Sequence, residues 1–186
     1  DQLGAVLEID ETSRAASFQA GIYGPDLEAA LRPRGYTLRH FPQSFPWSTL
    51  GGWIATRSGG HYATNHTHID DFVESVRMLT PAGWWESRRL PGSGAGPSPD
   101  RIVLGSEGTL GIITELTLRL SGIPESIASG VCPFPSVGAC CNAAILTIQS
   151  GIPVARIELL DALQVKASNA YSKLTLPEVP MLFLEF

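Results

Sequence analysis

Two glycine-rich runs inside otherwise apolar stretches limit how this chain can fold. The first covers residues 41–60 and contains the pair Gly51-Gly52, and the second covers residues 104–114. A glycine inside a helix or strand costs roughly 1 kcal/mol relative to alanine, so a compensating reason is expected at each position. One such reason is a flat ligand, because glycine lets peptide N–H groups reach phosphate and ring acceptors that a Cβ would hold off.

Close packing of the chain on itself is the alternative explanation for the same glycines. Gly51 and Gly52 would then let a helix pack tightly on a sheet, while Gly105, Gly108 and Gly111 would serve turns. Isolated glycine patterns are weak evidence for a ligand. Spacing alone therefore favours packing and leaves the ligand hypothesis open.

The hydrophobic pattern of the first two thirds predicts strands in antiparallel hairpins and one helix. Pro25 and Asp26 suit the first turn of the helix, and Pro33 with Gly35 suits its end. Short alternating or apolar runs indicate the strands. The strands are expected at residues 7–9, 15–22, 72–80, 84–86 and 112–120.

The last third changes to an alternation of strands and helices. Strands are expected at 131–134, at 154–159 and from Met181, and a helix is expected at 136–150. Ser136 and Asp161 are suitable amino-terminal caps for two helices. The buried face of the first helix is predicted to consist of Val137, Cys141, Ala144, Ile145 and Ile148. The sequence thus predicts an α+β fold whose second part is an open sheet covered by helices.

Composition excludes several classes of partner. Among 186 residues, 17% are charged and the formal net charge is −5, so no basic field attracts nucleic acid or anionic lipid. No apolar run is long enough to cross a bilayer, and no signal peptide is visible. Cys132, Cys140 and Cys141 are predicted to be buried thiols in a reducing compartment. Both ends of the sequence are expected to continue in a longer chain.

The amino-acid sequence of the glycine-rich runs resembles that of a known cofactor-binding domain. Residues 48–60, followed by residues 105–115, resemble the FAD-binding domain of the vanillyl-alcohol-oxidase type. Residues 1–120 are most similar to bacterial FAD-linked oxidases related to alkyldihydroxyacetonephosphate synthase, whereas residues 121–186 resemble FAD-dependent D-lactate dehydrogenases of the cytochrome-linked kind. This resemblance implies a partial FAD-binding domain at 1–122, without its amino-terminal pyrophosphate loop, and the start of a substrate-capping domain at 123–186.

The resemblance also implies which residues hold the cofactor. Segments 43–49 and 56–59 would line the flavin, with serine and threonine hydroxyls facing the phosphates and ring, and segment 107–113 would meet the adenine side through its backbone. Gln43 and Pro46 depart from the residues that relatives often carry there. The cofactor-binding residues expected from the resemblance are Pro42, Gln43, Ser44, Ser48, Thr49, Gly51, Gly52, Thr56, Arg57, Ser58, Gly59, Glu107, Gly108, Gly111, Ile112 and Ile113.

Arg156 is the candidate for substrate binding. It matches an arginine that in the family reaches the active site from the cap, and a guanidinium pairs bidentately with a carboxylate or phosphate. The alternative is a strand arginine paired with Glu158 or Asp161.

Other side chains invite functional readings that the sequence does not favour. His66 and His68 alternate as on a strand, but two imidazoles without a third ligand are weak evidence for a metal, so no metal site is predicted. Residues 65–67 fit a glycosylation acceptor only in an exported chain. Trp53, Trp84 and Trp85 could stack on a flavin, yet packing is the expected use of each.

The expected function is oxidation of a D-2-hydroxy acid such as D-lactate by hydride transfer to FAD. Arg156 would clamp the carboxylate of this small anionic substrate, and a dehydrogenase would also need an electron acceptor. The catalytic base is not identified. An alkyldihydroxyacetonephosphate-synthase-like flavin transferase is the rival enzyme, and a non-catalytic fragment of either is the remaining alternative.

Overall fold

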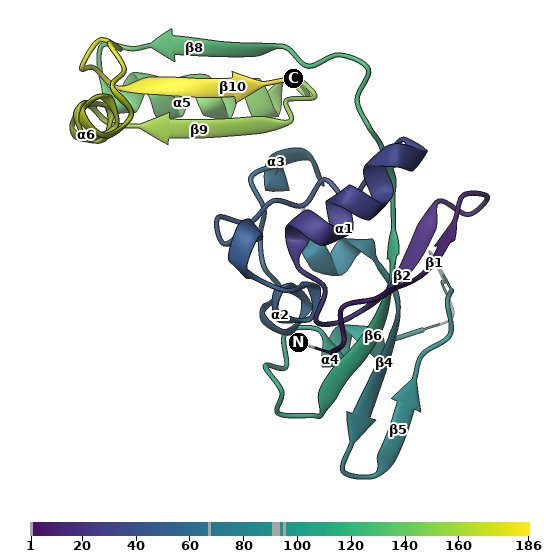
Figure 1. The fold of residues 1–186 in the computed structure, drawn as a ribbon. Coiled ribbons are helices and arrows are strands. Elements are labelled where there is room, and N and C mark those ends of the chain that lie inside the picture. Colours follow the sequence, from purple (N-terminus) through teal and green to yellow (C-terminus); the bar gives the residue numbers. More distant parts are fainter. Residues whose placement is uncertain (1, 67, 91–93, 95) are drawn as a thin grey trace. The chain divides into compact units, whose positions relative to one another are not determined.

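The computed structural model describes residues 2–66, 68–90, 94 and 96–186, and the chain divides into two compact units (Figure 1). The first comprises Asp1–His61 and Thr67–Ile123, and the second comprises Tyr62–His66 and Pro124–Phe186. Helices combine with antiparallel sheets in both units, which confirms the predicted α+β class.

The first unit is built on a five-stranded sheet in which all neighbouring strands are antiparallel. The predicted hairpins are present, and the chain turns directly from the fourth strand into the fifth at residues 81–82. In spatial order the strands are β1 (Val6–Asp10), β2 (Ala15–Gln19), β6 (Ile112–Arg119), β4 (Val73–Thr80) and β5 (Gly83–Glu86).

Short helices complete the core of this unit. The buried cluster includes Leu27 from α1 (Gly24–Leu31) and Leu50 and Ile54 from α2 (Leu50–Thr56). Phe18 and Leu116 join it from the sheet, and all five are fully or almost fully buried. Pro25 lies in the first turn of α1 as predicted, and Gly35 ends the following turn at a φ of 80°. The connecting elements are α1 (Gly24–Leu31), η1 (Arg32–Arg34), β3 (Tyr36–Thr37), η2 (Phe45–Trp47), α2 (Leu50–Thr56), η3 (Ile69–Phe72), α4 (Asp100–Val103) and β7 (Ser121–Gly122).

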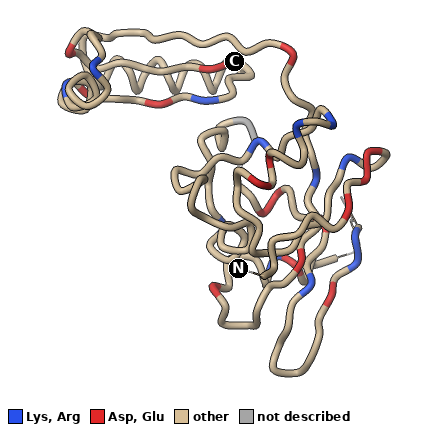
Figure 2. Tube along the Cα trace, in the orientation of Figure 1, with Lys and Arg blue, Asp and Glu red and all other residues tan. Residues whose placement is uncertain are grey.

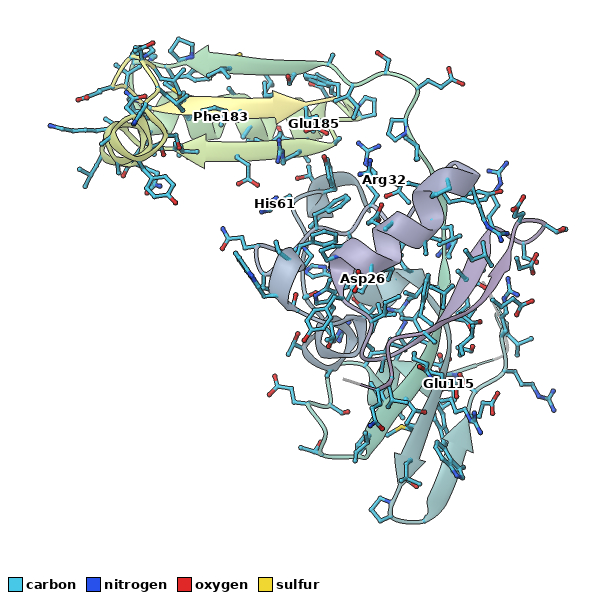
Figure 3. All side chains as sticks on the ribbon, viewed as in Figure 1. Asp26, Arg32, His61, Glu115, Phe183 and Glu185 are labelled. Atoms are coloured by element: carbon cyan, nitrogen blue, oxygen red, sulfur yellow. The ribbon has the colours of Figure 1, made fainter. Side chains whose placement is uncertain are left out.

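Charged side chains of the first unit are dispersed and largely paired. Acidic and basic residues intermingle along the trace rather than forming a patch of one sign (Figure 2). On the sheet, Arg77 Nη1 donates to Glu115 at 2.7 Å, a residue of β6 marked in Figure 3. In the same unit, Arg89 bridges the buried Glu74 at 2.8 Å and the partly buried Asp10 at 3.0 Å. No helix in the described part of the chain is long and apolar enough to span a membrane.

The second unit has a three-stranded antiparallel sheet ordered β8 (Ser129–Pro133), β10 (Met181–Glu185) and β9 (Arg156–Leu160). Its helices are α3 (Ala63–His66), α5 (Val137–Gln149) and α6 (Ala162–Ser172). Both predicted caps are confirmed, because Ser136 Oγ accepts from the Ala139 amide at 3.1 Å and Asp161 Oδ1 accepts from the Gln164 amide at 2.7 Å.

The buried face predicted for α5 is wrong by about one position around the helix. Cys140 is the fully buried residue of α5, whereas Val137, Cys141, Ile145 and Ile148 are exposed and Ala144 is only partly buried. Adjacent helical positions point about 100° apart, so the face that buries Cys140 leaves the neighbouring Cys141 exposed. The expectation of three buried thiols therefore holds for Cys140 but is wrong for Cys141, and Cys132 is half-buried.

His66 and His68 do not lie together on one strand. His66 ends the helix α3, and His68 bridges to Gly59 before η3 begins. The candidate glycosylation acceptor at 65–67 includes Thr67, which lies outside the described residues. Residues 91–93 and 95 of the glycine- and proline-rich stretch at 91–99 also lie outside them.

Candidate functional site

The candidate site is an open cavity of about 770 Å³ on the first unit. Four residues expected from the sequence to contact a cofactor line it: Thr49, Gly51, Gly52 and Ile113. The remaining lining comes from Gln2 and Leu3 near the amino terminus and from Ala20 and Gly21 after β2.

The start of α2 forms one wall, and its first amides are already used within the protein. The Leu50 amide donates to the Ile22 carbonyl at 3.0 Å and the Gly51 amide to the Ala20 carbonyl at 2.7 Å. Thr49 caps the helix, and its Oγ1 accepts from the Gly52 amide at 3.4 Å. These bonds dock α2 against the end of β2, so a ligand here would meet the surface of the helix rather than its unpaired amides.

Gly51 and Gly52 play different parts. A Cβ on Gly51 would lie 2.8 Å from Ala20 Cβ and 2.9 Å from Ala20 O, so this glycine allows close packing of helix on strand. A Cβ on Gly52 would meet only Thr49 Oγ1, at 3.4 Å. The packing explanation therefore accounts for Gly51, whereas Gly52 is exposed to the cavity.

The second glycine-rich run lies against the carboxyl end of the same helix. The Gly105 amide donates to the Ile54 carbonyl at 3.0 Å, and the Glu107 amide donates to the Ala55 carbonyl at 3.1 Å. Gly105 and Gly108 both have a φ of 81°, a region that side chains disfavour. The two runs are thus brought together in space by backbone hydrogen bonds that cap α2.

The hydroxyls expected to face a cofactor are engaged in local hydrogen bonds. Ser44 Oγ donates to Ser48 Oγ at 3.0 Å, and Ser48 Oγ donates to the Ser44 carbonyl at 2.8 Å. Trp53 Nε1 donates to Ser48 Oγ at 2.6 Å, which confirms packing as the use of this buried tryptophan. These contacts stabilise the turn that precedes α2.

His40 is a buried residue of the site that the sequence analysis left out of its candidates. Its ring lies 5.3 Å from the Trp53 ring, and its Nε2 is 2.9 Å from Ser58 Oγ. Burial, assisted by the nearby His68, lowers the pKa of His40 from 6.5 to about 4, so the imidazole is neutral at physiological pH. A lone histidine before the Phe41-Pro42 pair was the available sequence signal.

Asp70 is a second residue that the sequence analysis missed. Its buried carboxylate accepts through Oδ2 from Arg57 Nη2 at 2.6 Å and from Arg101 Nη1 at 2.7 Å. The guanidinium of Arg57, one of the expected cofactor contacts, is thereby directed to Asp70. Nothing in the sequence marks Asp70 apart from an acidic pair between apolar residues.

The other expected cofactor residues lie outside the cavity lining, and most are on the surface. Pro42 is buried, and Ser48, Ser58 and Gly111 are partly buried. A Cβ at Gly111 would collide with the Leu79 carbonyl oxygen, so this glycine also serves close packing. The exposed members are Gln43, Ser44, Thr56, Arg57, Gly59, Glu107, Gly108 and Ile112.

In the second unit, Arg156 pairs across strands with Glu185, which Figure 3 labels on β10. Arg156 Nη2 donates to Glu185 Oε2 at 3.0 Å, and the Glu185 side chain is only 9% exposed. The guanidinium also lies 5.8 Å from the Tyr62 ring. The expected alternative partners were Glu158 and Asp161, yet the antiparallel register places Glu185 directly opposite Arg156.

Two further expectations concern aromatic and metal sites. Trp84 is 60% exposed and lies under the Arg77 guanidinium at 4.7 Å, and Trp85 packs at the margin of the core. Within the described ranges, no group of three or more histidine, cysteine, aspartate and glutamate side chains is arranged to hold a metal ion.

Comparisons with known proteins match both units. Residues 1–87 match the family model described as "FAD binding domain", and residues 123–186 match the model "FAD linked oxidases, C-terminal domain". Alkyldihydroxyacetonephosphate synthase of Dictyostelium discoideum is 38% identical over 170 residues, which cover 91% of this chain and 28% of that protein. Mitochondrial D-lactate dehydrogenase [cytochrome] of Arabidopsis thaliana is 42% identical over 143 residues, covering 76% and 25%.

Solved structures of alkyldihydroxyacetonephosphate synthase are also similar to this chain. One structure of alkyldihydroxyacetonephosphate synthase superposes with a TM-score of 0.88 at 32% sequence identity, and it covers all of this chain and 37% of the matched chain. The chain therefore spans well under half the length of these relatives.

Proposed function

Residues 1–87 and 123–186 belong to the FAD-binding and C-terminal domain families of the FAD-linked oxidases, and from this premise we propose that the chain is part of an FAD-dependent D-2-hydroxy-acid dehydrogenase. D-Lactate is the proposed representative substrate. The similarity to D-lactate dehydrogenase, at 42% identity over 143 residues, supports this substrate class.

The lining of the cavity supports the proposal that it contacts FAD. FAD supplies the hydride acceptor when bound. Gly21, Gly51, Gly52 and the small Ala20 keep their part of the wall free of bulky side chains, which favours close contact with a flat dinucleotide. The observation that carries the proposal is that four residues implied by the family resemblance, from two runs some 60 residues apart, line this one cavity. Because the first amides of α2 are used internally, this wall would contribute surface contact rather than phosphate charge stabilisation.

Arg156 is the proposed contact for the substrate carboxylate. Its guanidinium is held by the buried Glu185 and is one-third exposed, so further N–H donors can reach a second carboxylate. A guanidinium fixed in this way loses little conformational freedom when it orients a substrate. An electron acceptor of undetermined chemistry would reoxidise the enzyme.

The test is anaerobic flavin absorbance of the full-length gene product with bound FAD. Addition of D-lactate is expected to bleach the oxidised flavin band. A bound flavin that stays oxidised with D-lactate and with other D-2-hydroxy acids would refute the dehydrogenase. Absence of any bound flavin, including after titration with FAD, would leave the non-catalytic alternative.

Two variants separate substrate binding from stability. Arg156→Ala and Glu185→Gln both remove the cross-strand ion pair, but only Arg156→Ala removes the guanidinium. We expect Arg156→Ala to raise the KM for D-lactate roughly tenfold or more, as loss of one charged contact of about 1.5–3 kcal/mol implies. Equal effects of the two variants on KM would instead indicate that Arg156 acts only within the sheet.

A flavin transferase of the alkyldihydroxyacetonephosphate synthase kind is the second candidate. It is favoured by the 91% coverage of this chain in the Dictyostelium match and by the TM-score of 0.88. An arginine at position 156 suits its anionic substrate equally well. In the same absorbance experiment this candidate predicts bound flavin that D-2-hydroxy acids do not reduce.

A further inference from the structure

The two glycine-rich runs are connected by side chains as well as by backbone. At the end of α2, Arg57 adopts a left-handed conformation with a φ of 52°. From there its aliphatic stem lies across Gly105, where a Cβ would be only 2.6 Å from Arg57 Cδ and 2.8 Å from Cγ. The stem of Arg57 therefore covers the first glycine of the second run at the point where that run caps α2.

Asp70 holds Arg57 in this place. Its side chain is 4% exposed and belongs to η3, which is itself attached to the first run because the Ile69 amide donates to the Ser58 carbonyl at 3.2 Å. The guanidinium of Arg57 is therefore bonded at 2.6 Å to a carboxylate that is almost fully buried. Arg57 is 53% exposed, so without Asp70 a long side chain at this position would sample several rotamers.

The same carboxylate oxygen also fixes the element that precedes the second run. Arg101 of α4 donates to Asp70 Oδ2 at 2.7 Å and to Asp71 Oδ1 at 3.1 Å, and α4 leads directly into Leu104 and Gly105. Asp70 thus contacts one arginine from each side of the junction between the runs. If Asp70 contacted one run alone, only the two backbone hydrogen bonds from the Gly105 and Glu107 amides would fix the position of the second run relative to the first.

We propose that Asp70 is a positioning residue for the cofactor site: by clasping Arg57 and Arg101 through one buried oxygen, it sets segment 105–111 against α2. This inference rests on the proposed function, since segment 107–113, which continues from Gly105, is expected to meet FAD. Asp70 acts through the two arginines and does not line the cavity.

The experiment compares Asp70→Asn with Glu74→Gln in the full-length protein. Glu74 is a matched control, because it is also a buried carboxylate of the first unit bonded to an arginine, Arg89, at 2.8 Å. Thermal unfolding reports the stability of each variant, titration of the apoprotein reports its FAD dissociation constant, and hydrogen exchange reports the protection of the Gly105 and Glu107 amides. Arg57→Gln serves as a second variant that removes the clasp from its exposed end, should Asp70→Asn not fold.

We expect Asp70→Asn and Arg57→Gln to weaken FAD binding about tenfold. Both variants should also lose hydrogen-exchange protection at the Gly105 and Glu107 amides. Glu74→Gln should change the unfolding temperature but leave the FAD affinity and the protection of those amides unaltered. Equal loss of FAD affinity in Asp70→Asn and Glu74→Gln would overturn the inference, as would unchanged FAD affinity in Arg57→Gln. If the wild-type protein itself binds no FAD, the proposed function fails; the hydrogen-exchange comparison still decides whether Asp70 positions the segment.

Discussion

Adding a single methyl group at Gly51 and at Gly52 should have opposite effects on stability. At Gly51 the new Cβ would lie 2.8 Å from Ala20 Cβ and 2.9 Å from Ala20 O, so α2 must shift away from β2 and strain the 2.7 Å bond from the Gly51 amide. Overpacking of this kind costs about 1–3 kcal/mol, and the helix preference of alanine offsets up to about 1 kcal/mol. We expect Gly51→Ala to destabilise the protein by about 1–2 kcal/mol.

At Gly52 the methyl group meets only Thr49 Oγ1, at 3.4 Å. The gain in helix preference then remains, and we expect Gly52→Ala to stabilise the apoprotein by about 0.5–1 kcal/mol. Because Gly52 lines the cavity, the same change should weaken FAD binding. Urea unfolding followed by far-UV circular dichroism measures the first effect, and FAD titration measures the second. If Gly51→Ala were as stable as Gly52→Ala, the close packing of α2 on Ala20 would be refuted.

Two predictions concern the dependence of stability on pH. The folded pKa of His40, about 4, is below its unfolded value of 6.5; the unfolded chain therefore binds more protons between these values, and stability falls as pH drops through this window. His40→Gln should remove about 2–3 kcal/mol of that loss of stability. A plot of unfolding temperature against pH should therefore be flatter for His40→Gln than for the wild type between pH 6.5 and 4. An unchanged slope would contradict a buried neutral imidazole. Hydrogen bonds from Ser13, and then Arg89, lower the pKa of Asp10 from 3.8 to about 2, so its contribution is present above pH 3.8 and lost as pH falls towards 2. Asp10→Asn should reduce the steepness of acid unfolding between pH 4 and 2, and an equal steepness would argue against these contacts in solution.

Elements whose evidence is local were predictable. The helix that begins at Gly24-Pro25, the β4–β5 hairpin and the caps Ser136 and Asp161 all occur near the predicted positions, because turn chemistry and capping act between residues a few positions apart. The face of α5 was not predictable in this way. Cys140 and Cys141 are both apolar enough to be buried, and only the position of the three-stranded sheet decides which of them is.

The candidate site divides along the same line. The sequence indicated both glycine-rich runs as candidate cofactor contacts. It could not distinguish Gly51, which packs on Ala20, from Gly52, which is exposed to the cavity. For the alternative in which Arg156 is a paired strand arginine, the sequence offered only the nearby Glu158 and Asp161, whereas the strand register pairs Arg156 with Glu185, 29 positions away.

By itself, the sequence determined the α+β class, the order of most strands, the helices α1, α5 and α6, and the two runs in which glycine is needed. The tertiary structure alone decided that these runs cap the same helix, that Asp70 bonds to Arg57 and Arg101, and that Glu185 bonds to Arg156. The physical reason is the separation along the sequence over which each interaction acts. Backbone conformation and capping depend on neighbouring residues, whereas burial and ion pairing depend on which distant segments the sheet brings together.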